Sequence, residues 1–581
     1  MVARRRIRNA VVPILAAILV SCVGTERALS PVSTATTVSG KSWRSSRFLE
    51  LNPDQPARSG ASPGVTGHAF DITRKSSSEA WAALSLYETS SSRFQGYARR
   101  FQPGRSGNGW AIGSLKVTAS AAVDVWGASI GVDASGQSMR ALFSNATSAA
   151  VADQFTLAAY AGSRWNLISG LDAGTGAGGP PDFPVMLGAS GISGTTQLLS
   201  SLFWAPGFSQ VVDSRGRILA FYVDRGDATA VDHRAQVQVF DPGVQPALAL
   251  RANSYMLGAE LGLSQFEDVG TCGATKCVYP QVRAVADGTG RACAVFQYTD
   301  TGPAATDVRA RCVTLSALDY ANPAANYLPV GAPQSLTDTT LTGGAEQPAL
   351  ASDGEGHVLA MFYQYDSSGF GYAYSSLITD GVFASAPESA HAVIADADDG
   401  TYPFYTSDAS APYVAPAVTS LGSGKFLAVF VSGDGGSAEG LFSAVYTADE
   451  GWSDPQLIAE TAWDQARTRF AHVSLVSDGI GGVGGSGNAL LMVQWIASQD
   501  GGDSTGYSDV RRTLAARYDA SAGWTSLTAL DGVCTAYGTS TLMPYCTHPP
   551  RGVLFPSGEA VVLYQSQDIF GDYRLAASEF R

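Results

Sequence analysis

A short motif built on glycine recurs along the chain and constrains its fold more than any other feature. In each copy a glycine precedes a short apolar run, and an aromatic or apolar residue stands six positions after that glycine. The seven copies are Gly136/Leu142, Gly216/Tyr222, Gly290/Phe296, Gly356/Phe362, Gly424/Phe430, Gly487/Val493 and Gly558/Tyr564. Successive glycines lie 80, 74, 66, 68, 63 and 71 residues apart. A period of this size, filled with short strands, predicts a radial or stacked repeat protein.

The repeat around Gly424 shows the strands expected in one unit. Residues 416–420 alternate between apolar and polar, and residues 425–431 form a nearly continuous apolar run, as a strand buried on both faces does. Residues 441–446 make a third strand, and Trp452 opens a fourth. Helix-period patterns are absent, so each unit is predicted to be a four-stranded antiparallel meander.

Turn residues repeat in the same frame. Asp-x-x-Gly precedes the apolar strand at residues 133–136, 213–216, 287–290 and 353–356, where Asp caps a tight turn and Gly supplies a positive φ. Proline is expected to open the first strand of five units, at Pro206, Pro280, Pro348, Pro416 and Pro550. Tryptophan begins four outer strands, at Trp110, Trp165, Trp452 and Trp524, where it can cover the seam between neighbouring sheets while its indole N–H stays near water.

Four-stranded sheets at this spacing predict an all-β fold, a single β-propeller whose ring leaves only short protected edges. The seven glycine-marked units and an earlier one at 81–117 give eight blades; seven is the alternative, because the first two units are the least regular. The last unit, ending at Phe580, lacks a fourth strand. Residues 41–52 contain an orphan strand, which is predicted to complete that blade and close the ring.

The repeats leave no linker between about residue 66 and residue 581, which predicts one domain over 41–581. The 64 glycines and the low content of charged residues, 15%, suit a turn-rich β protein. Ahead of this domain, residues 22–40 are rich in Ser, Thr, Val and Pro and are expected to form a flexible tether.

The first 21 residues have the pattern of a secretory signal peptide: four arginines, then an apolar stretch too short to span a bilayer. Residues 19–22, Leu-Val-Ser-Cys, resemble the lipobox of bacterial lipoproteins. The resemblance implies cleavage before Cys22, a diacylglycerol on its thiol, and a protein anchored to a membrane of the bacterial cell envelope. Val23, rather than Asp, implies the outer membrane. The alternative is an ordinary secretory peptide that contains a cysteine.

Charge and cysteine content agree with export. Without the four arginines of the leader, 33 basic residues face 51 acidic ones, a formal charge of −18 that disfavours nucleic acid as a partner. The six remaining cysteines fall into three close pairs: Cys272 with Cys277, Cys293 with Cys312, and Cys534 with Cys546. We expect disulfides; zinc is the competing interpretation, but the spacings are irregular and no histidine is near.

The polar repeats also resemble, distantly, those of sialidases and related bacterial propellers over most of the chain. The Asp-box of the sialidases, Ser-x-Asp-x-Gly-x-x-Trp, is nevertheless nowhere intact. Arg283 and Arg551 lie on predicted inner strands and are candidates for an anion site at the channel; ion-paired structural arginines are the alternative. His472 and His548 precede predicted inner strands and are candidates for the channel mouth.

Other features point to ligands only in part. Asp396, Asp398 and Asp399 precede Gly400 as in a calcium loop, but the downstream glutamate is missing, so a solvated turn is the alternative. Residues 370–374 and 401–405 carry aromatic side chains that suit either stacking on a sugar or packing within a blade. No motif of a hydrolase occurs, and no other cofactor is expected.

Three functions therefore stand open from sequence. The first is a lipid-anchored, monomeric propeller that binds a glycan, a peptide or a partner protein without catalysis. The second is a glycoside hydrolase or lyase with its active site in the central channel. The third is a scaffold within an envelope complex. A pair of carboxylates, or a cluster of Arg, Tyr and Asp in the channel, is expected for the enzyme.

Overall fold

The computed structural model describes the chain from residue 41 to residue 581, with gaps. The described ranges are 41–49, 69–88, 93–105, 109–111, 114–117, 124–148, 151–161, 164–167, 208–224, 234–240, 261–262, 277–299, 306–315, 327–338, 344–365, 370–384, 388–389, 404–405, 415–433, 438–462, 468–481, 484–500, 507–538, 548–567 and 573–581. These ranges contain strands and turns, and no helix in them is long and apolar enough to cross a membrane.

The described strands form eight antiparallel sheets. The first four are β2(Phe70–Ser76) to β5(Leu115–Lys116), with β3(Glu79–Glu88) and β4(Arg93–Phe101); β6(Asp124–Val132) to β9(Arg164–Leu167), with β7(Met139–Ser148) and β8(Val151–Ala161); β10(Phe208–Val212) to β13(Leu261–Gly262), with β11(Ile218–Asp224) and β12(Arg234–Phe240); and β14(Cys277–Ala286) to β17(Tyr327–Ser335), with β15(Arg291–Thr299) and β16(Thr306–Leu315).

The second half of the chain repeats the plan with extra short strands. Its sheets are β18(Ala345–Ser352), β19(His357–Tyr365) and β20(Phe370–Thr379) with β21(Val382–Phe383), β22(Glu388–Ser389) and β23(Phe404–Tyr405); β24(Ala417–Gly422), β25(Lys425–Gly433) and β26(Ala438–Thr447) with β27(Gly451–Trp452) and β28(Gln456–Ala462); β29(Thr468–Ser477), β30(Asn488–Asp500) and β31(Tyr507–Asp519) with β32(Gly523–Trp524), β33(Thr528–Ala529) and β34(Cys534–Gly538); and β35(Arg551–Leu554), β36(Ala560–Gln567) and β37(Tyr573–Phe580) with β1(Arg47–Phe48).

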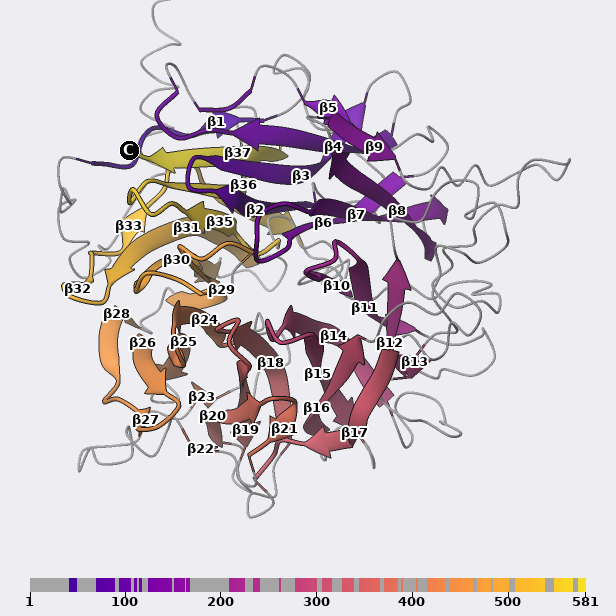
Figure 1. Cartoon of the computed structure of the whole chain (residues 1–581). Coiled ribbons are helices and arrows are strands. Elements are labelled where there is room, and N and C mark those ends of the chain that lie inside the picture. Colours follow the sequence, from indigo (N-terminus) through magenta and orange to yellow (C-terminus); the bar gives the residue numbers. More distant parts are fainter. Residues whose placement is uncertain are drawn as a thin grey trace, which may run out of the picture.

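The sheets are arranged in a ring around a central axis (Figure 1). The first strand of each sheet is the inner one: β2, β6, β10, β14, β18, β24, β29 and β35 each contact the next, and β35 contacts β2 again. The fold is therefore the all-β propeller that the repeat period predicts. Layers of buried apolar side chains between consecutive sheets hold the ring together, one of them joining β24–β26 to β29–β31.

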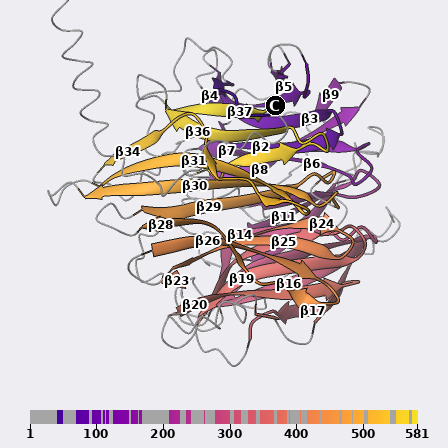
Figure 2. The same ribbon diagram turned by 90° about the vertical axis from the view of Figure 1, so that its left-hand side faces the viewer.

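The two ends of the described chain meet in one sheet, as predicted. Strand β1 pairs antiparallel with β37, with Arg47 opposite Ala577 and Phe48 opposite Ala576. Backbone bonds extend this pairing in both directions, from Leu49 N to Leu575 O (2.9 Å) and from Ser42 N to Arg581 O (2.8 Å). In Figure 1 the yellow β37 lies beside the indigo β1, and Figure 2 shows β36 and β37 beside β3 and β4 from the side.

The Asp-x-x-Gly turns form as their sequence predicts. In the turn after β14, Asp287 Oδ1 accepts hydrogen bonds from the amides of Thr289 (2.8 Å) and Arg291 (3.0 Å), and Gly290 has a φ of 99°. The turns also join one sheet to the next: Gly356 N donates to Asp287 O (2.9 Å), and Gly424 N donates to Asp353 Oδ2 (3.0 Å). Each aspartate therefore caps its own turn, and these two also fix the neighbouring sheet.

Tryptophans of the outer strands bridge the seams between sheets. Trp452 Nε1 donates to Ser375 Oγ (3.0 Å), and Trp524 Nε1 donates to Ser443 Oγ (2.8 Å), each serine belonging to the preceding sheet. The sequence pattern predicts that these indole N–H groups stay near water. In these two seams a serine of the neighbouring sheet accepts the hydrogen bond instead.

The prolines occupy two kinds of position, which corrects the prediction that they open inner strands. Pro416 and Pro550 immediately precede β24 and β35. Pro280 and Pro348 lie inside β14 and β18, where the pairing register shifts between Val278 and Val282 and between Glu346 and Ala349. A bulge leaves a backbone N–H unpaired, so a proline there removes no ladder hydrogen bond. Pro206 lies outside the described residues.

One of the three expected disulfides is described in full. Cys293 on β15 and Cys312 on β16 are bonded to each other, at directly opposed positions with Cα atoms 4.0 Å apart. Both Cys293 and Cys312 are fully buried, in the apolar cluster between this sheet and the next. The pairing of Cys312 with Cys293 is therefore a cross-strand disulfide and not part of a zinc site.

The other cysteines are described only in part. Cys534 is disulfide-bonded. Its expected partner Cys546, and Cys272, lie outside the described residues, and nothing is described of the Cys277 side chain.

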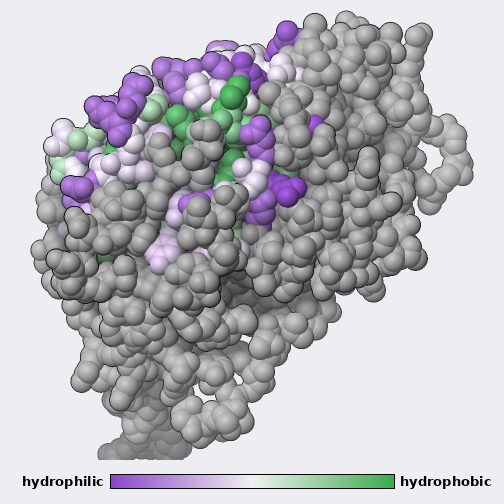
Figure 3. Space-filling view, turned by 90° about the horizontal axis from the view of Figure 1, so that it is seen from below, coloured by the Kyte–Doolittle hydropathy of each residue, from purple (hydrophilic) through white to green (hydrophobic). Residues whose placement is uncertain are grey.

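The outer surface shows no large apolar area among its described residues. On the face seen in Figure 3, hydrophilic side chains surround a smaller hydrophobic area. The described exposed large apolar residues are scattered: Phe48, Leu115, Val382 and Leu457.

Candidate functional site in the central cavity

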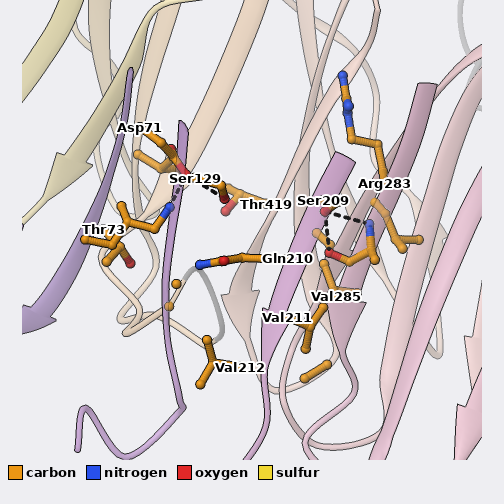
Figure 4. A pocket seen from close by; sticks show the side chains of 18 of the residues that line it. Asp71, Thr73, Ser129, Ser209, Gln210, Val211, Val212, Arg283, Val285 and Thr419 are labelled. Carbon is orange, nitrogen blue, oxygen red and sulfur yellow. Dashed lines mark hydrogen bonds between the residues drawn. The ribbon is translucent and has the colours of Figure 1, made fainter. Parts of the chain in front are cut away.

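A cavity of about 590 Å³ runs along the axis of the ring. It is lined by residues of all eight inner strands, by the turns that follow β6, β10 and β14, and by Gly481 after β29. Figure 4 shows Asp71, Ser129, Ser209, Arg283 and Thr419 around this space, from five different strands. Cavities of this size are typical of sites for small organic ligands.

Equivalent residues of the inner strands lie at one height along the cavity axis, because the strand register is the same in several sheets. Seven lining residues pair with the residue that stands five positions after the repeat glycine of their unit: Ile130 with Ala141, Ser209 with Phe221, Arg283 with Val295, Ala349 with Met361, Ala417 with Val429, Ser474 with Met492 and Arg551 with Leu563. The repeat therefore places one side chain from each of these sheets at the same height. Variation at this position in the repeat changes the chemistry of the cavity without disturbing the framework.

Two of these side chains are arginines on opposite sides of the ring. In the ring of eight inner strands, β35 is the fourth strand from β14 in either direction. Arg283 and Arg551 therefore face each other across the axis. Burial, with the charge of Arg551 second, lowers the pKa of Arg283 to about 10. Its guanidinium donates to the carbonyl of Val282 (3.2 Å), while Arg551 Nη1 donates to Ser474 Oγ (3.3 Å).

A single carboxylate, Asp71, accompanies the two arginines at this level. Asp71 Oδ2 accepts hydrogen bonds from Ser129 Oγ (3.2 Å) and Ile130 N (3.0 Å), in the next sheet. Burial raises the pKa of Asp71, and the positive charge of Arg551 opposes that shift. The other carboxylate that lines the cavity, Asp213, caps its own turn and is paired with Arg217 at 2.6 Å.

Two histidines lie next to this cluster. His472 lines the cavity inside β29, at a bulge where its φ is 50°, and not ahead of the strand as predicted. His548 precedes β35, as predicted; its ring packs on Phe70 at 4.0 Å between centroids, and its Nδ1 lies 2.9 Å from Pro549 O. Burial is the main cause that lowers both pKa values, with Arg551 adding to it, and the pKa of His548 falls to about 3.

The depressed pKa of His548 predicts a loss of stability in acid. Above its ordinary pKa of 6.5 the His548 ring is neutral in both the folded and the unfolded protein. Below pH 6.5 the ring becomes protonated in the unfolded chain, whereas in the folded protein it stays neutral down to about pH 3. Within this pH window, each unit of acidification lowers the free energy of unfolding by at most about 1.4 kcal/mol through His548. We expect urea titrations of His548→Gln between pH 6.5 and 4.5 to show a shallower loss than the native protein. If the free energies of unfolding of the variant and of the native protein fall equally with pH, the prediction is wrong.

The structure gives different outcomes for the predicted site residues. It places Arg283, Arg551 and His472 on the cavity and His548 beside it. Cys22, Asp396, Asp398 and Asp399 lie outside the described residues, which hold no group of three His, Cys, Asp or Glu suited to a metal ion. Tyr374 is 8% exposed and stacks on Phe362, so in the stretch 370–374 this residue packs within its blade.

Asp71 and Ser474 belong to the site but are not identified by the sequence patterns. Strand β2 is not followed by an Asp-x-x-Gly turn, because residues 76–79 make the turn to β3, so the repeat motif does not mark the inner strand of the first sheet. The alternation of Phe70 and Ile72 around Asp71 is the signal that marks the strand. Ser474 lies on an inner strand that the Asp-x-x-Gly spacing does not mark, because nine positions, rather than three, separate Asp478 from Gly487.

No protein-family model and no curated protein matches the chain. Among solved structures, it is similar to the β-propeller domain of the trilobed protease from Pyrococcus furiosus (8% identity, 77% of this chain, 92% of that chain, TM-score 0.34). It is also similar to levansucrase from Bacillus subtilis in complex with oligosaccharides (10% identity, 53% of this chain, 85% of that chain, TM-score 0.30). A third similar structure is Trypanosoma rangeli sialidase in complex with sialic acid (11% identity, 64% of this chain, 53% of that chain, TM-score 0.28). Identities and TM-scores this low bear on neither the ligand nor the chemistry of this chain.

Proposed function

We propose that this protein is a non-enzymatic binding module that holds a small anionic ligand, such as an acidic sugar, in its central cavity. The supporting observation is the facing pair Arg283 and Arg551, two half-buried guanidiniums with one carboxylate, Asp71, at their level. The other acidic group of the lining is already paired with Arg217. A surplus of positive charge inside a chain of formal charge −14 favours an anion there.

The remaining lining suits a hydroxylated ligand. Ser209, Gln210, Thr419 and Ser474 supply hydroxyl and amide groups from three further sheets. Such groups accept from and donate to sugar hydroxyls, whereas the arginines bind a carboxylate or phosphate by charge-assisted bonds. An acidic monosaccharide meets both requirements within about 590 Å³.

The catalytic alternative lacks a partner group in the described part of the cavity. Glycoside hydrolysis uses two carboxyl groups on either side of the scissile bond. Among the lining residues described, Asp71 is the carboxyl group that is not committed to a turn and an ion pair. Binding therefore accounts for this cavity better than hydrolysis does, and an assay for released reducing sugar discriminates between them.

Calorimetric titration with galacturonate, glucuronate and inorganic phosphate, with galactose as the neutral counterpart, tests the proposal. We expect at least one anion to bind and galactose to bind far more weakly. Loss of a charge-assisted hydrogen bond costs about 1.5–3 kcal/mol, so Arg283→Gln and Arg551→Gln should each weaken binding by roughly 10- to 100-fold. Arg309→Gln, which removes an arginine paired with Asp307 away from the cavity, is the matched control. Equal binding of galactose, or no heat with any anion, would refute the proposal.

The cellular setting is part of the same proposal. The lipobox-like residues 19–22 support cleavage before Cys22 and attachment of a diacylglycerol, so that residues 22–40 tether the propeller to a bacterial envelope membrane. Labelling of growing cells with a radioactive fatty acid should mark the native protein and not the Cys22→Ser variant. An unlabelled native protein would exclude the anchor and leave the cavity proposal intact.

A further inference from the structure

Two Ser/Arg pairs lie on opposite sides of the cavity. One pair is Ser209 on β10 with Arg283 on β14, and the other is Ser474 on β29 with Arg551 on β35. All four residues have the same place in the strand register of their sheets. In the ring of inner strands β29 is the fourth strand from β10, as β35 is from β14. A half-turn about the axis of the ring therefore carries the strands of one pair onto those of the other.

The members of each pair are close to each other at the wall of the cavity. Arg551 Nη1 donates a hydrogen bond to Ser474 Oγ (3.3 Å). Figure 4 shows Ser209 and Arg283 on neighbouring strands, and Ser209 Oγ accepts a hydrogen bond from Ala284 N (3.2 Å), in the residue after Arg283. Arg283 Nη1 donates to the backbone carbonyl of the residue before it (3.2 Å). Each guanidinium is therefore bonded to its own side of the cavity, which gives two separate positions for an anionic group.

The side chains between the two pairs add no positive charge at this level. On one side, Ala349 and Ala417 have the same place in the register of β18 and β24. On the other side lie Ile130 on β6 and Asp71 on β2. The two oxygens of Asp71 accept hydrogen bonds from the backbone N–H groups of Ile72 (2.9 Å) and Ile130 (3.0 Å). The positive charge of this level is therefore divided between two opposite points.

The charges of the lining favour a doubly charged ligand. Among the described residues, five arginines and two aspartates line the cavity. Two of these arginines are ion-paired with the Asp of the preceding Asp-x-x-Gly turn. Three arginines and one aspartate of the lining remain: Arg215, Arg283, Arg551 and Asp71. Two positive charges are left when the aspartate is subtracted, and two negative charges on a ligand match them.

We infer that the ligand carries two separate anionic groups, one bound by each Ser/Arg pair, and that its class is the sugar dicarboxylates. This inference rests on the proposed function, to which it adds a second anionic group at the far end of the ligand. A guanidinium binds one carboxylate through two parallel N–H···O bonds, and a serine hydroxyl can donate a third bond to that carboxylate. A ligand with one carboxylate therefore leaves the charge of the opposite arginine unmatched. Gln210 and Thr419, which also line the cavity, suit the hydroxyl groups between the two carboxylates.

Calorimetric titration of the full-length protein with galactarate and galactonate at neutral pH tests the inference. These two open-chain acids have the same row of hydroxyl groups, but galactarate has a carboxylate at both ends and galactonate at one end. We expect one galactarate to bind per protein, roughly 10- to 100-fold more tightly than galactonate, as one further charge-assisted hydrogen bond provides.

The outcomes of this titration separate the two proposals. If galactarate and galactonate bind equally, or if neither binds while galacturonate does, the inference is wrong and the proposed function stands. If no anion gives heat, the proposed function is wrong as well.

Arginine variants test where the second carboxylate binds. We expect Arg283→Gln and Arg551→Gln each to remove most of the advantage of galactarate over galactonate, because one Ser/Arg pair then lacks its charge. Arg309→Gln, away from the cavity, should keep that advantage. A full advantage in either cavity variant would place the second carboxylate elsewhere and overturn the inference.

A series of unbranched dicarboxylates, from malonate to azelate, tests the same inference without any variant. Two anion positions at a fixed separation bind best the ligand whose length matches that separation, and shorter ligands cannot span it. We expect the affinities, measured by competition with galactarate, to pass through a maximum within the series. Affinities that stay flat or rise steadily with length would contradict the inference, even if no arginine variant folds.

Discussion

Leu49→Ala is expected to lower the free energy of unfolding by about 2–5 kcal/mol, although the residue follows a strand of only two residues. Leu49 is 0% exposed and belongs to the apolar cluster that joins the last sheet to the first. Its truncation leaves a cavity at the seam where the ring closes. The measurement is chemical denaturation followed by tryptophan fluorescence.

The matched control for Leu49→Ala is the preceding residue. Phe48 lies in β1 and is 40% exposed, so Phe48→Ala should cost less than about 1 kcal/mol. Deletion of residues 41–49 should exceed Leu49→Ala, because it also removes the backbone bonds to β37 and the contact of Trp43 with Phe580. If Leu49→Ala and the deletion both leave the transition unchanged, the strand does not close the ring in solution.

The second large effect is expected at a glycine that touches the neighbouring sheet. Gly288 has a φ of 82°, and a methyl group on it would overlap the backbone carbonyl of Gly354. Backbone cannot move aside as a flexible side chain does, so Gly288→Ala must displace one turn from the other. We expect a loss of at least about 3 kcal/mol, combining strain at positive φ with overpacking.

Gly290 provides the comparison within the same turn. Its φ is 99°, but a methyl group on it would meet nothing within 4 Å. Gly290→Ala should therefore cost only the conformational strain, about 1–2 kcal/mol. The difference between the two variants in thermal or urea unfolding measures the contact between the sheets. Equal losses would show that this contact contributes nothing.

The sequence predicts the framework well because the framework depends on local rules. Asp287 and Gly290 specify a turn by their own hydrogen bonds and backbone preference, and the apolar run after them specifies a buried strand, whatever the rest of the chain does. The pairing of the two chain ends was also predictable, since a last unit of three strands leaves an edge that an orphan strand can cover.

The site was predictable only in part, because a cavity at the axis joins residues that are far apart in sequence. The sequence predicts Arg283 and Arg551 as cavity residues because both lie on recognisable inner strands, but their position opposite each other depends on the number of sheets between them. Asp71 has no local mark of function. Its proximity to Ser129 appears only when the ring brings β2 and β6 together.

The meeting of β1 with β37 also dictates the order of assembly. Seven sheets are completed by strands that follow one another, so each can form before the rest of the chain is available. The eighth must wait until residues 573–580 have been synthesised, and until then residues 41–49 have no strand to join. Closing so long a loop carries an entropic cost that no earlier step meets. A chain truncated before residue 573 should therefore leave its first strand accessible to proteases, whatever the state of the sheets between.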